Sequence, residues 1–236
     1  MIKIEANKLL KFFNKVSVNN TLIDAKLQFK EDGLYVCGKD AAGVLATDGF
    51  FKKENFTEYE IVEINIKDTT KFAMALSNQG SDIINIVKEE NMINIIDKNG
   101  SLNLVEAESI SSYEEGMKEK FTGLTYEGSV DILKSNINDI MNKNKIVKGN
   151  SITIENVNKE LFFKIGEEID KAETKSISVL ESEIKTKFQM SYFELITGVI
   201  ADNVIFKFGI DGLSPAKIEE VDPMYSINYY LAPLSE

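Results

Sequence analysis

The chain has 236 residues, of which 27 are basic and 38 are acidic, so its formal net charge is −11. It contains no His, no Trp and no Arg, which excludes Ser-His-Asp and Cys-His catalytic sites and any zinc site with His ligands. Hydrophobic residues make up 43%, enough for a globular core, and the length suits one large domain or two small ones. The single cysteine, Cys37, cannot form an internal disulfide, and a reducing intracellular location is the simpler interpretation.

Apolar periodicity predicts four amphipathic helices, each preceded by a strand. The strand–helix pairs, in chain order, are Met1–Ala6 with Asn7–Val16, Tyr59–Ile66 with Asp68–Leu76, Leu124–Val130 with Asp131–Lys143, and Ile184–Met190 with Ser191–Val199. Further strands are expected at Thr21–Phe29, Gly33–Gly38, Ile83–Lys88, Met92–Asp97 and Leu102–Ala107. The short turns between these strands favour antiparallel meanders over parallel units with a helix between every two strands.

The order of elements repeats after about 124 residues, which is too long a period for a solenoid and indicates a duplicated domain. We therefore predict an α+β fold of two similar domains, at 1–107 and 124–236. The stretch 108–123 is polar and mostly acidic, and we expect it to be an exposed linker. Its apolar residues, Ile110, Met117 and Phe121, either pin the linker to a sheet or edge a binding groove; the first alternative is the commoner one.

Lysines follow the outer faces of three predicted helices. Lys8, Lys11 and Lys15 form one stripe and Lys71 lies on the second helix, while Lys134, Lys143, Lys145 and Lys148 belong to the third helix or follow it. Such lysines are usually a solvated face, but their matching positions in both halves of a very acidic chain indicate a basic surface. That surface could neutralise the phosphates of DNA but could not read bases, so any binding would be independent of sequence and sensitive to salt. The fourth helix fits less well, because its expected exposed positions include Glu194 and Thr197 and no lysine.

Nothing in the sequence indicates catalysis. Cys37 lies in an apolar strand without a nearby His or Arg to lower its pKa, so we expect a buried structural cysteine. The paired acidic residues lie in turns, in the linker or at a strand end, and do not make convergent dyads. We predict no catalytic residues, no metal site and no cofactor.

The C-terminal segment carries the most specific pattern. It reads Asp211-Gly212-Leu213-Ser214-Pro215-Ala216, and then Asp222-Pro223-Met224-Tyr225 through Tyr229-Tyr230-Leu231-Ala232-Pro233. This ending closely resembles that of the proliferating cell nuclear antigen (PCNA) family, which includes eukaryotic and archaeal DNA sliding clamps. The start of the chain, Lys8-Leu9-Leu10-Lys11-Phe12-Phe13 after a short strand, and the two-half plan with its linker also resemble the family.

The resemblance implies a homotrimeric ring of head-to-tail subunits, with sheets outside and helices lining the hole. Lys8, Lys11, Lys15, Lys71, Lys134, Lys143 and Lys145 would face double-stranded DNA. The expected partners are DNA polymerase, other client proteins with short docking peptides, and a clamp loader, but no membrane. Carried over by position, the client pocket would use Val44, Met117, Phe121, Tyr230, Leu231, Ala232 and Pro233. Ser214 and Lys39 replace a usual proline and a usual apolar residue, which makes the pocket more polar than in the family.

Open sheet edges would join the subunits, since an unpaired edge strand invites pairing with another chain. The candidates are Leu102–Ala107 of one subunit and Lys171–Ser178 of the next, with Leu102, Leu104, Lys175 and Ile177 at the interface. Two alternatives stay open. One is a clamp-fold adaptor in a heteromeric or partial ring that recruits repair proteins without supporting replication. The other is a Mg-dependent carboxylate enzyme, which needs convergent acids that the sequence does not show.

Overall fold

The computed structural model describes residues 1–80, 82–126, 128–167, 170–179, 183–209 and 214–234; the side chains of 167, 170 and 176–179 lie outside this description. Contacts between residues divide the chain into two compact units. Unit 1 contains Met1–Ala41, Thr47–Glu119 and Asp222–Ile227, and unit 2 contains Ala42–Ala46, Lys120–Val221 and Asn228–Glu236. The division between Glu119 and Lys120 falls inside the stretch expected to be the linker, while the domain limits themselves remain a prediction.

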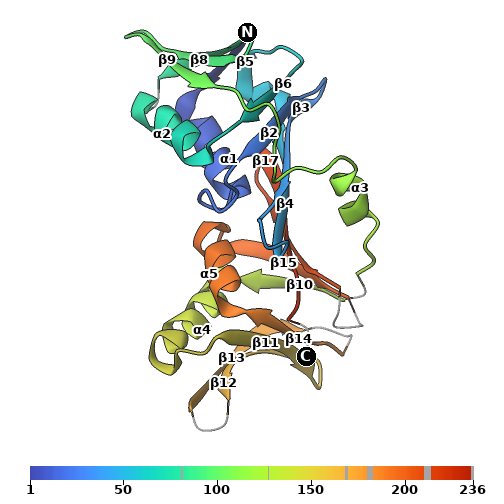
Figure 1. Cartoon of the computed structure of the whole chain (residues 1–236). Coiled ribbons are helices and arrows are strands. Elements are labelled where there is room, and N and C mark those ends of the chain that lie inside the picture. The colour runs from blue at the N-terminus through green and yellow to red at the C-terminus, as the bar shows by residue number, and fades with distance from the viewer. Residues whose placement is uncertain (81, 127, 168–169, 180–182, 210–213, 235–236) are drawn as a thin grey trace. The chain divides into compact units, whose positions relative to one another are not determined.

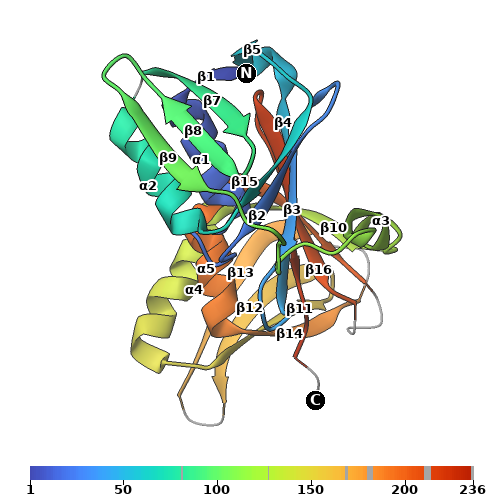
Figure 2. The same cartoon turned by 45° about the horizontal axis from the view of Figure 1, so that its top comes forward.

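Unit 1 holds two sheets, whose strands are labelled in Figures 1 and 2. The first has the order β5-β1-β7-β8-β9, with β5 at Phe56–Glu58, β1 at Ile2–Glu5, β7 at Ile83–Glu89, β8 at Met92–Ile96 and β9 at Ser101–Val105. The second is the β4-β3-β2-β6 part of a longer, eight-stranded sheet, with β4 at Leu45–Lys52, β3 at Gly33–Lys39, β2 at Ala25–Phe29 and β6 at Val62–Ile66. A 3-10 turn, η1 (Lys53–Asn55), links β4 to β5. Burial alternates along β1, β2 and β8, because one face of each strand points into the core.

Two helices complete unit 1: α1 (Ala6–Val16) and α2 (Thr69–Gln79). The apolar stripe of α1 is fully buried, and the ring of its Phe13 meets that of Phe72 on α2 at 4.9 Å, edge to face. The Asp68 side chain caps α2 by accepting a hydrogen bond from the backbone N–H of Lys71. Gly80 ends the helix with φ 58°, a conformation that favours glycine.

Unit 2 contains further strands of the longer sheet, a complete four-stranded sheet and the helices α4 and α5. These elements are labelled in Figures 1 and 2. The strands of the longer sheet that follow in unit 2 have the order β10-β15-β16-β17, with β10 at Gly128–Leu133, β15 at Asn203–Phe208, β16 at Ala216–Val221 and β17 at Tyr225–Leu231. The four-stranded sheet has the order β13-β12-β11-β14, formed by β11 (Ser151–Val157), β12 (Glu160–Glu167), β13 (Asp170–Val179) and β14 (Lys185–Gln189). Helices α4 (Lys134–Val147) and α5 (Met190–Val199) pack against this four-stranded sheet. Strands β4 and β17 contribute residues to both units.

The expected α+β class is confirmed: every strand pair whose register is described is antiparallel, and each unit has two long helices. Several expected limits were wrong in detail: α2 ends at Gln79 rather than Leu76, and α4 ends at Val147 rather than Lys143. Asp131–Leu133 belongs to β10 rather than to the third helix, because these residues pair with Asn203–Ile205 of β15. The linker also contains a short helix, α3 (Met117–Thr122), which was not predicted because the linker sequence shows no long helical stripe. Among the described residues, no helix is long and apolar enough to cross a bilayer.

Candidate functional site

The lysines predicted on unit 1 lie on the solvent side of its helices. Lys11 is exposed, with Nζ 3.4 Å from Asp222 Oδ2 and 5.5 Å from the centroid of the Tyr225 ring. Lys8 Nζ lies 3.3 Å from Glu5 Oε2, and Lys15 is half-buried in the last turn of α1. Lys71 is the most exposed member, at 73%, and its Nζ lies 3.6 Å from an Asp68 oxygen. Exposed ion pairs of this kind are worth about 0–1 kcal/mol, so they hold these ammonium groups only weakly.

In unit 2 the predicted lysines divide into two kinds. Lys143 Nζ is held by three oxygens: Asp139 Oδ2 at 2.8 Å, the Glu173 carbonyl at 2.7 Å and Thr174 Oγ1 at 2.9 Å. Lys134 donates to the Ile200 carbonyl at 2.8 Å and is half-buried. These two lysines therefore brace α4 against its neighbours. Lys145, in contrast, is exposed and contacts only Asn142 of its own helix among the described contacts, at 2.9 Å.

Helix α5 differs from its prediction at one position. Glu194 is exposed as expected, but Thr197 is 6% exposed and donates to the Glu194 carbonyl at 3.0 Å. A shallow hollow opens where the C-terminal end of α4 meets the start of α5. It brings Lys187 together with Lys145 and Lys148. Sequence periodicity could not have grouped Lys187 with the others, because it lies on β14 rather than on a helix.

The residues expected to form the client pocket gather in unit 2, except for one. The Phe121 and Tyr230 rings stack with centroids 4.3 Å apart and planes 16° apart. The Ala232 N–H donates to the Val44 carbonyl at 2.9 Å, which ties the chain after β17 to the start of β4. Tyr230 and Leu231 are buried and Pro233 is half-buried. Lys217 Nζ also approaches the Tyr230 ring, at 5.9 Å from its centroid.

The exception is Met117, which belongs to unit 1 and is buried there. Around it the linker is held against unit 1 by polar contacts. Asp24 accepts hydrogen bonds from the Ser111 N–H and Oγ, both at 2.7 Å, and from the Ser112 N–H at 2.9 Å. Burial opposes ionisation of Asp24, but the bonds from Ser112 and Ser111 outweigh it and lower its pKa. The linker is thus fixed by a buried carboxylate rather than being fully exposed, and Lys39 pairs with Glu114 beside it at 3.0 Å.

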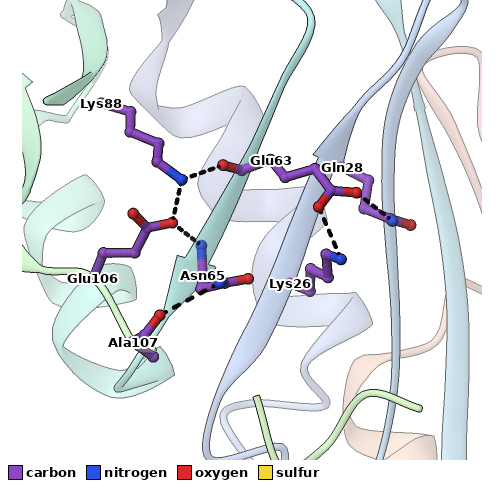
Figure 3. A network of polar contacts seen from close by, with 7 residues as sticks. All are labelled: Lys26, Gln28, Glu63, Asn65, Lys88, Glu106 and Ala107. Carbon is purple, nitrogen blue, oxygen red and sulfur yellow. Dashed lines mark hydrogen bonds and ion pairs between the residues drawn. The ribbon is translucent and has the colours of Figure 1, made fainter. Parts of the chain in front are cut away.

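A second polar cluster ties the start of the linker to β6 (Figure 3). Glu106, whose side chain is 8% exposed, accepts from Lys88 Nζ at 2.7 Å and from the Asn65 N–H at 2.9 Å. The Lys88 ammonium also donates to the Glu63 carbonyl at 2.9 Å. The Glu63 carboxylate in turn accepts hydrogen bonds from Lys26 Nζ and Gln28 Nε2 on β2, each at 2.9 Å. These bonds lower the pKa of Glu63. Periodicity cannot find such a cluster, since its members come from β2, β6, β7 and the residue after β9.

Both strands proposed for the subunit interface are at sheet edges. Strand β9 is the last strand of the sheet β5-β1-β7-β8-β9, and its Leu102 is exposed while Leu104 is half-buried. Strand β13 is the first strand of the sheet β13-β12-β11-β14, and Lys175 Nζ on it pairs with Glu160 Oε1 at 2.5 Å. The side chain of Ile177 lies outside the described residues. A groove of about 630 Å³ lies between β9, β8 and the start of α2, and its apolar wall includes Ile23, Ile93 and Val105.

The described residues show no group of three acidic, cysteine or histidine side chains that could hold a metal ion. Cys37 is buried as predicted, and burial raises the pKa of its thiol to about 12, which disfavours the nucleophilic thiolate.

Of the C-terminal segment that resembles the PCNA family, Asp211–Leu213 lie outside the described residues, while Ser214 is half-buried.

Similarity to known proteins extends along nearly the whole chain, although no protein-family model matches it. A DNA polymerase sliding clamp 2 of Sulfolobus acidocaldarius is 22% identical over 227 residues, which cover 90% of this chain and 91% of that protein. The solved structure of the C-terminal region of FEN-1 bound to A. fulgidus PCNA matches with a TM-score of 0.81 at 15% identity, covering 100% of this chain and 99% of that one. A PCNA2–PCNA3 complex of Sulfolobus tokodaii matches with a TM-score of 0.77 at 17% identity, with the same coverage. The structural matches show the clamp fold, and together with the sequence match they confirm the expected resemblance.

Proposed function

We infer, from a clamp fold and a similarity to a sliding clamp that both extend over nearly the whole chain, that this protein belongs to the PCNA family, and we propose that it is a DNA sliding clamp. In this proposal the protein is not an enzyme. It encircles duplex DNA and tethers DNA polymerase and other replication and repair proteins. The observation that carries the proposal is the match of the entire fold, both units included, to solved PCNA chains.

The ring would be a homotrimer built through the open edges of β9 and β13. Edge strands present unpaired backbone N–H and C=O groups, so joining them extends a sheet across the subunit boundary. The groove beside β9 supports this choice because its apolar lining and the exposed Val105 would be buried on association. A head-to-tail contact closes into a ring when its rotation allows.

Contact with DNA would be electrostatic and independent of sequence. With lysine as the only basic residue, the helices can neutralise phosphates but cannot form the bidentate guanidinium contacts that read guanine. The exposed lysines Lys11, Lys71 and Lys145 are the best placed for this role, since the ion pairs of Lys11 and Lys71 are weak and Lys145 is hydrogen-bonded only to Asn142 of its own helix among the described contacts. Weak phosphate contacts suit a sliding protein, because the closed ring rather than affinity would keep it on DNA.

Client proteins would dock at the edge formed by Val44, Phe121 and Tyr230–Pro233, and a clamp loader would open the ring. The similarity to a PCNA with the C-terminal region of FEN-1 bound supports docking of short peptides. Replication takes place inside the cell, so we also propose an intracellular location, in the cytoplasm with the nucleoid or in a nucleus.

A primed single-stranded circle extended by the cognate polymerase and loader tests the proposal. Addition of the protein should lengthen the products, and product lengths that do not change with the protein would contradict a polymerase role. Light scattering after gel filtration should give three times the chain mass. A monomer that assembles only with a second clamp chain would instead favour the heteromeric adaptor.

A further inference from the structure

We propose that Phe121 is an internal occupant of the client-docking edge, which a client must displace before it can bind. The inference rests on the proposed docking function and concerns the contact between Phe121 and Tyr230, both of which belong to unit 2. In the protein without a client, the aromatic side chain of Phe121 covers this edge. The resemblance, in contrast, only assigns Phe121 to the lining of the pocket.

The first argument is geometric. The ring of Phe121 lies nearly parallel to that of Tyr230, with 4.3 Å between centroids and 16° between planes. This is close stacking, because the separation is slightly shorter than the usual centroid range of roughly 4.5–7 Å for aromatic pairs. Tyr230 is 2% exposed, so no incoming side chain can reach its ring face while Phe121 stays there.

The second argument concerns how firmly Phe121 is held. It lies on α3, a helix of six residues whose other members are polar apart from Met117 at its start. Glycines lie on both sides of the helix, and Gly116 has φ 76°, a conformation that favours glycine. The linker N–H of Leu124 reaches the Phe121 carbonyl only at 3.3 Å. Isolated helices this short are marginal in water, so tertiary contacts hold α3: Met117 is buried and Lys118 Nζ lies 4.1 Å from the Tyr35 ring centroid near its start, while the stack on Tyr230 holds Phe121 near its end.

The third argument is that the rest of the edge is fixed. Ala232 is bonded to Val44, and the buried side chains of Tyr230 and Leu231 belong to a paired strand. When Phe121 leaves, the Tyr230 face is therefore uncovered without rearrangement of β17. The group best able to take its place is a flat aromatic side chain, which can stack on Tyr230 beside the ammonium of Lys217.

The experiment measures binding of a fluorescein-labelled peptide with the sequence of the FEN-1 C-terminal region to the full chain and its variants. Phe121→Ala should bind roughly two- to tenfold more tightly than the unchanged protein, the range expected for release of one aromatic stack. Weaker binding by Phe121→Ala would show that the Phe121 side chain lines the pocket and contacts the client, and it would overturn the inference. Tyr230→Ala should lose binding in either case. Phe162→Ala, which removes a half-buried ring from β12, should leave affinity unchanged.

A second readout does not depend on affinity. Because the chain has no tryptophan, Phe121→Trp places one reporter at the site. Its fluorescence should resist acrylamide quenching in the free protein, and become quenchable and shift to the red when the peptide is added. If acrylamide already quenched the tryptophan fluorescence in the free protein, the inference would be overturned whether or not any peptide binds. A shielded reporter with no peptide binding to any variant would contradict the docking function, and the inference with it.

Discussion

At the scale of single residues, Asp24 shows how a carboxylate can organise a linker. It is 8% exposed, and its carboxylate accepts three hydrogen bonds from Ser111 and Ser112. The Ser112 hydroxyl also donates to the backbone carbonyl of Asp24 at 2.8 Å. We expect Asp24→Ala to lower the free energy of unfolding by about 1–3 kcal/mol, because the buried donors of the linker lose their acceptor. Urea unfolding at neutral pH measures this, and Glu31→Ala, at an exposed position, should change it by less than about 0.5 kcal/mol.

The same carboxylate gives a pH dependence of known sign. The folded pKa of Asp24 is lower than its unfolded value, so its contribution to stability is present above the unfolded pKa of about 3.9. The contribution is lost as the pH falls through the lower folded value. Asp24→Asn should therefore reduce the difference in unfolding free energy between pH 7 and the acid range. An unchanged difference between the variant and the parent would show that Asp24 does not ionise more readily when folded.

Glu106 provides a second residue-scale test, in the cluster of Figure 3. Its carboxylate pairs with the Lys88 ammonium and accepts a hydrogen bond from the Asn65 N–H of β6, and its side chain is 8% exposed. We expect Glu106→Gln to cost about 1–3 kcal/mol, since the charge-assisted bond to Lys88 is lost in a mostly buried place. Glu58→Gln is the matched control: Glu58 also pairs with a lysine, Lys3 at 3.2 Å, but its side chain is 44% exposed. Equal losses for the two variants would contradict the role of burial.

At the scale of elements, the sequence predicts what periodicity governs and misses what tertiary pairing decides. Helix α1 begins one residue before its predicted start and ends at Val16 as predicted, because its apolar stripe repeats cleanly, whereas α2 continues three residues beyond its predicted end, to Gln79. The start of α4 was placed three residues early, since Asp131–Leu133 also fits a helical stripe and only the pairing with β15 makes it a strand. Helix α3 is too short to show a period. The lysines were found from spacing, but the bracing of Lys143 against β13 depends on a neighbour that spacing cannot reveal.

The edge strand β9 carries a prediction about assembly. Val105 is 55% exposed and lines the groove beside the strand, and no charged residue lies within β9. Val105→Lys should weaken the ring, because an ammonium would be desolvated at the subunit contact. Light scattering as a function of concentration should show monomers where the parent protein is trimeric. Val157→Lys, at an exposed valine on the inner strand β11, should leave the trimer intact.

At the scale of the whole molecule, an acidic protein that holds DNA must separate its charges in space. The net charge of −11 repels DNA from a distance, so any attraction must come from local groups of lysine whose own partners are weak. The structure distinguishes such lysines from structural ones. Lys71 is 73% exposed beside a single aspartate, whereas Lys143 is held by three oxygens within unit 2.

This distinction predicts different consequences for two lysines proposed to face DNA. Lys71→Ala should weaken retention of the assembled ring on duplex DNA and reduce the slope of log affinity against log salt, by roughly 0.9 for each phosphate that is no longer neutralised. Each subunit of a ring carries one Lys71, so the substitution removes this ammonium group from every subunit at once. Lys143→Ala should instead lower unfolding stability and leave the slope nearly unchanged, because its ammonium is already occupied by Asp139, Glu173 and Thr174. Binding of duplex DNA at several salt concentrations, with urea unfolding of the same samples, separates the two effects. The reverse pattern would mean that Lys143 releases its protein partners for phosphate.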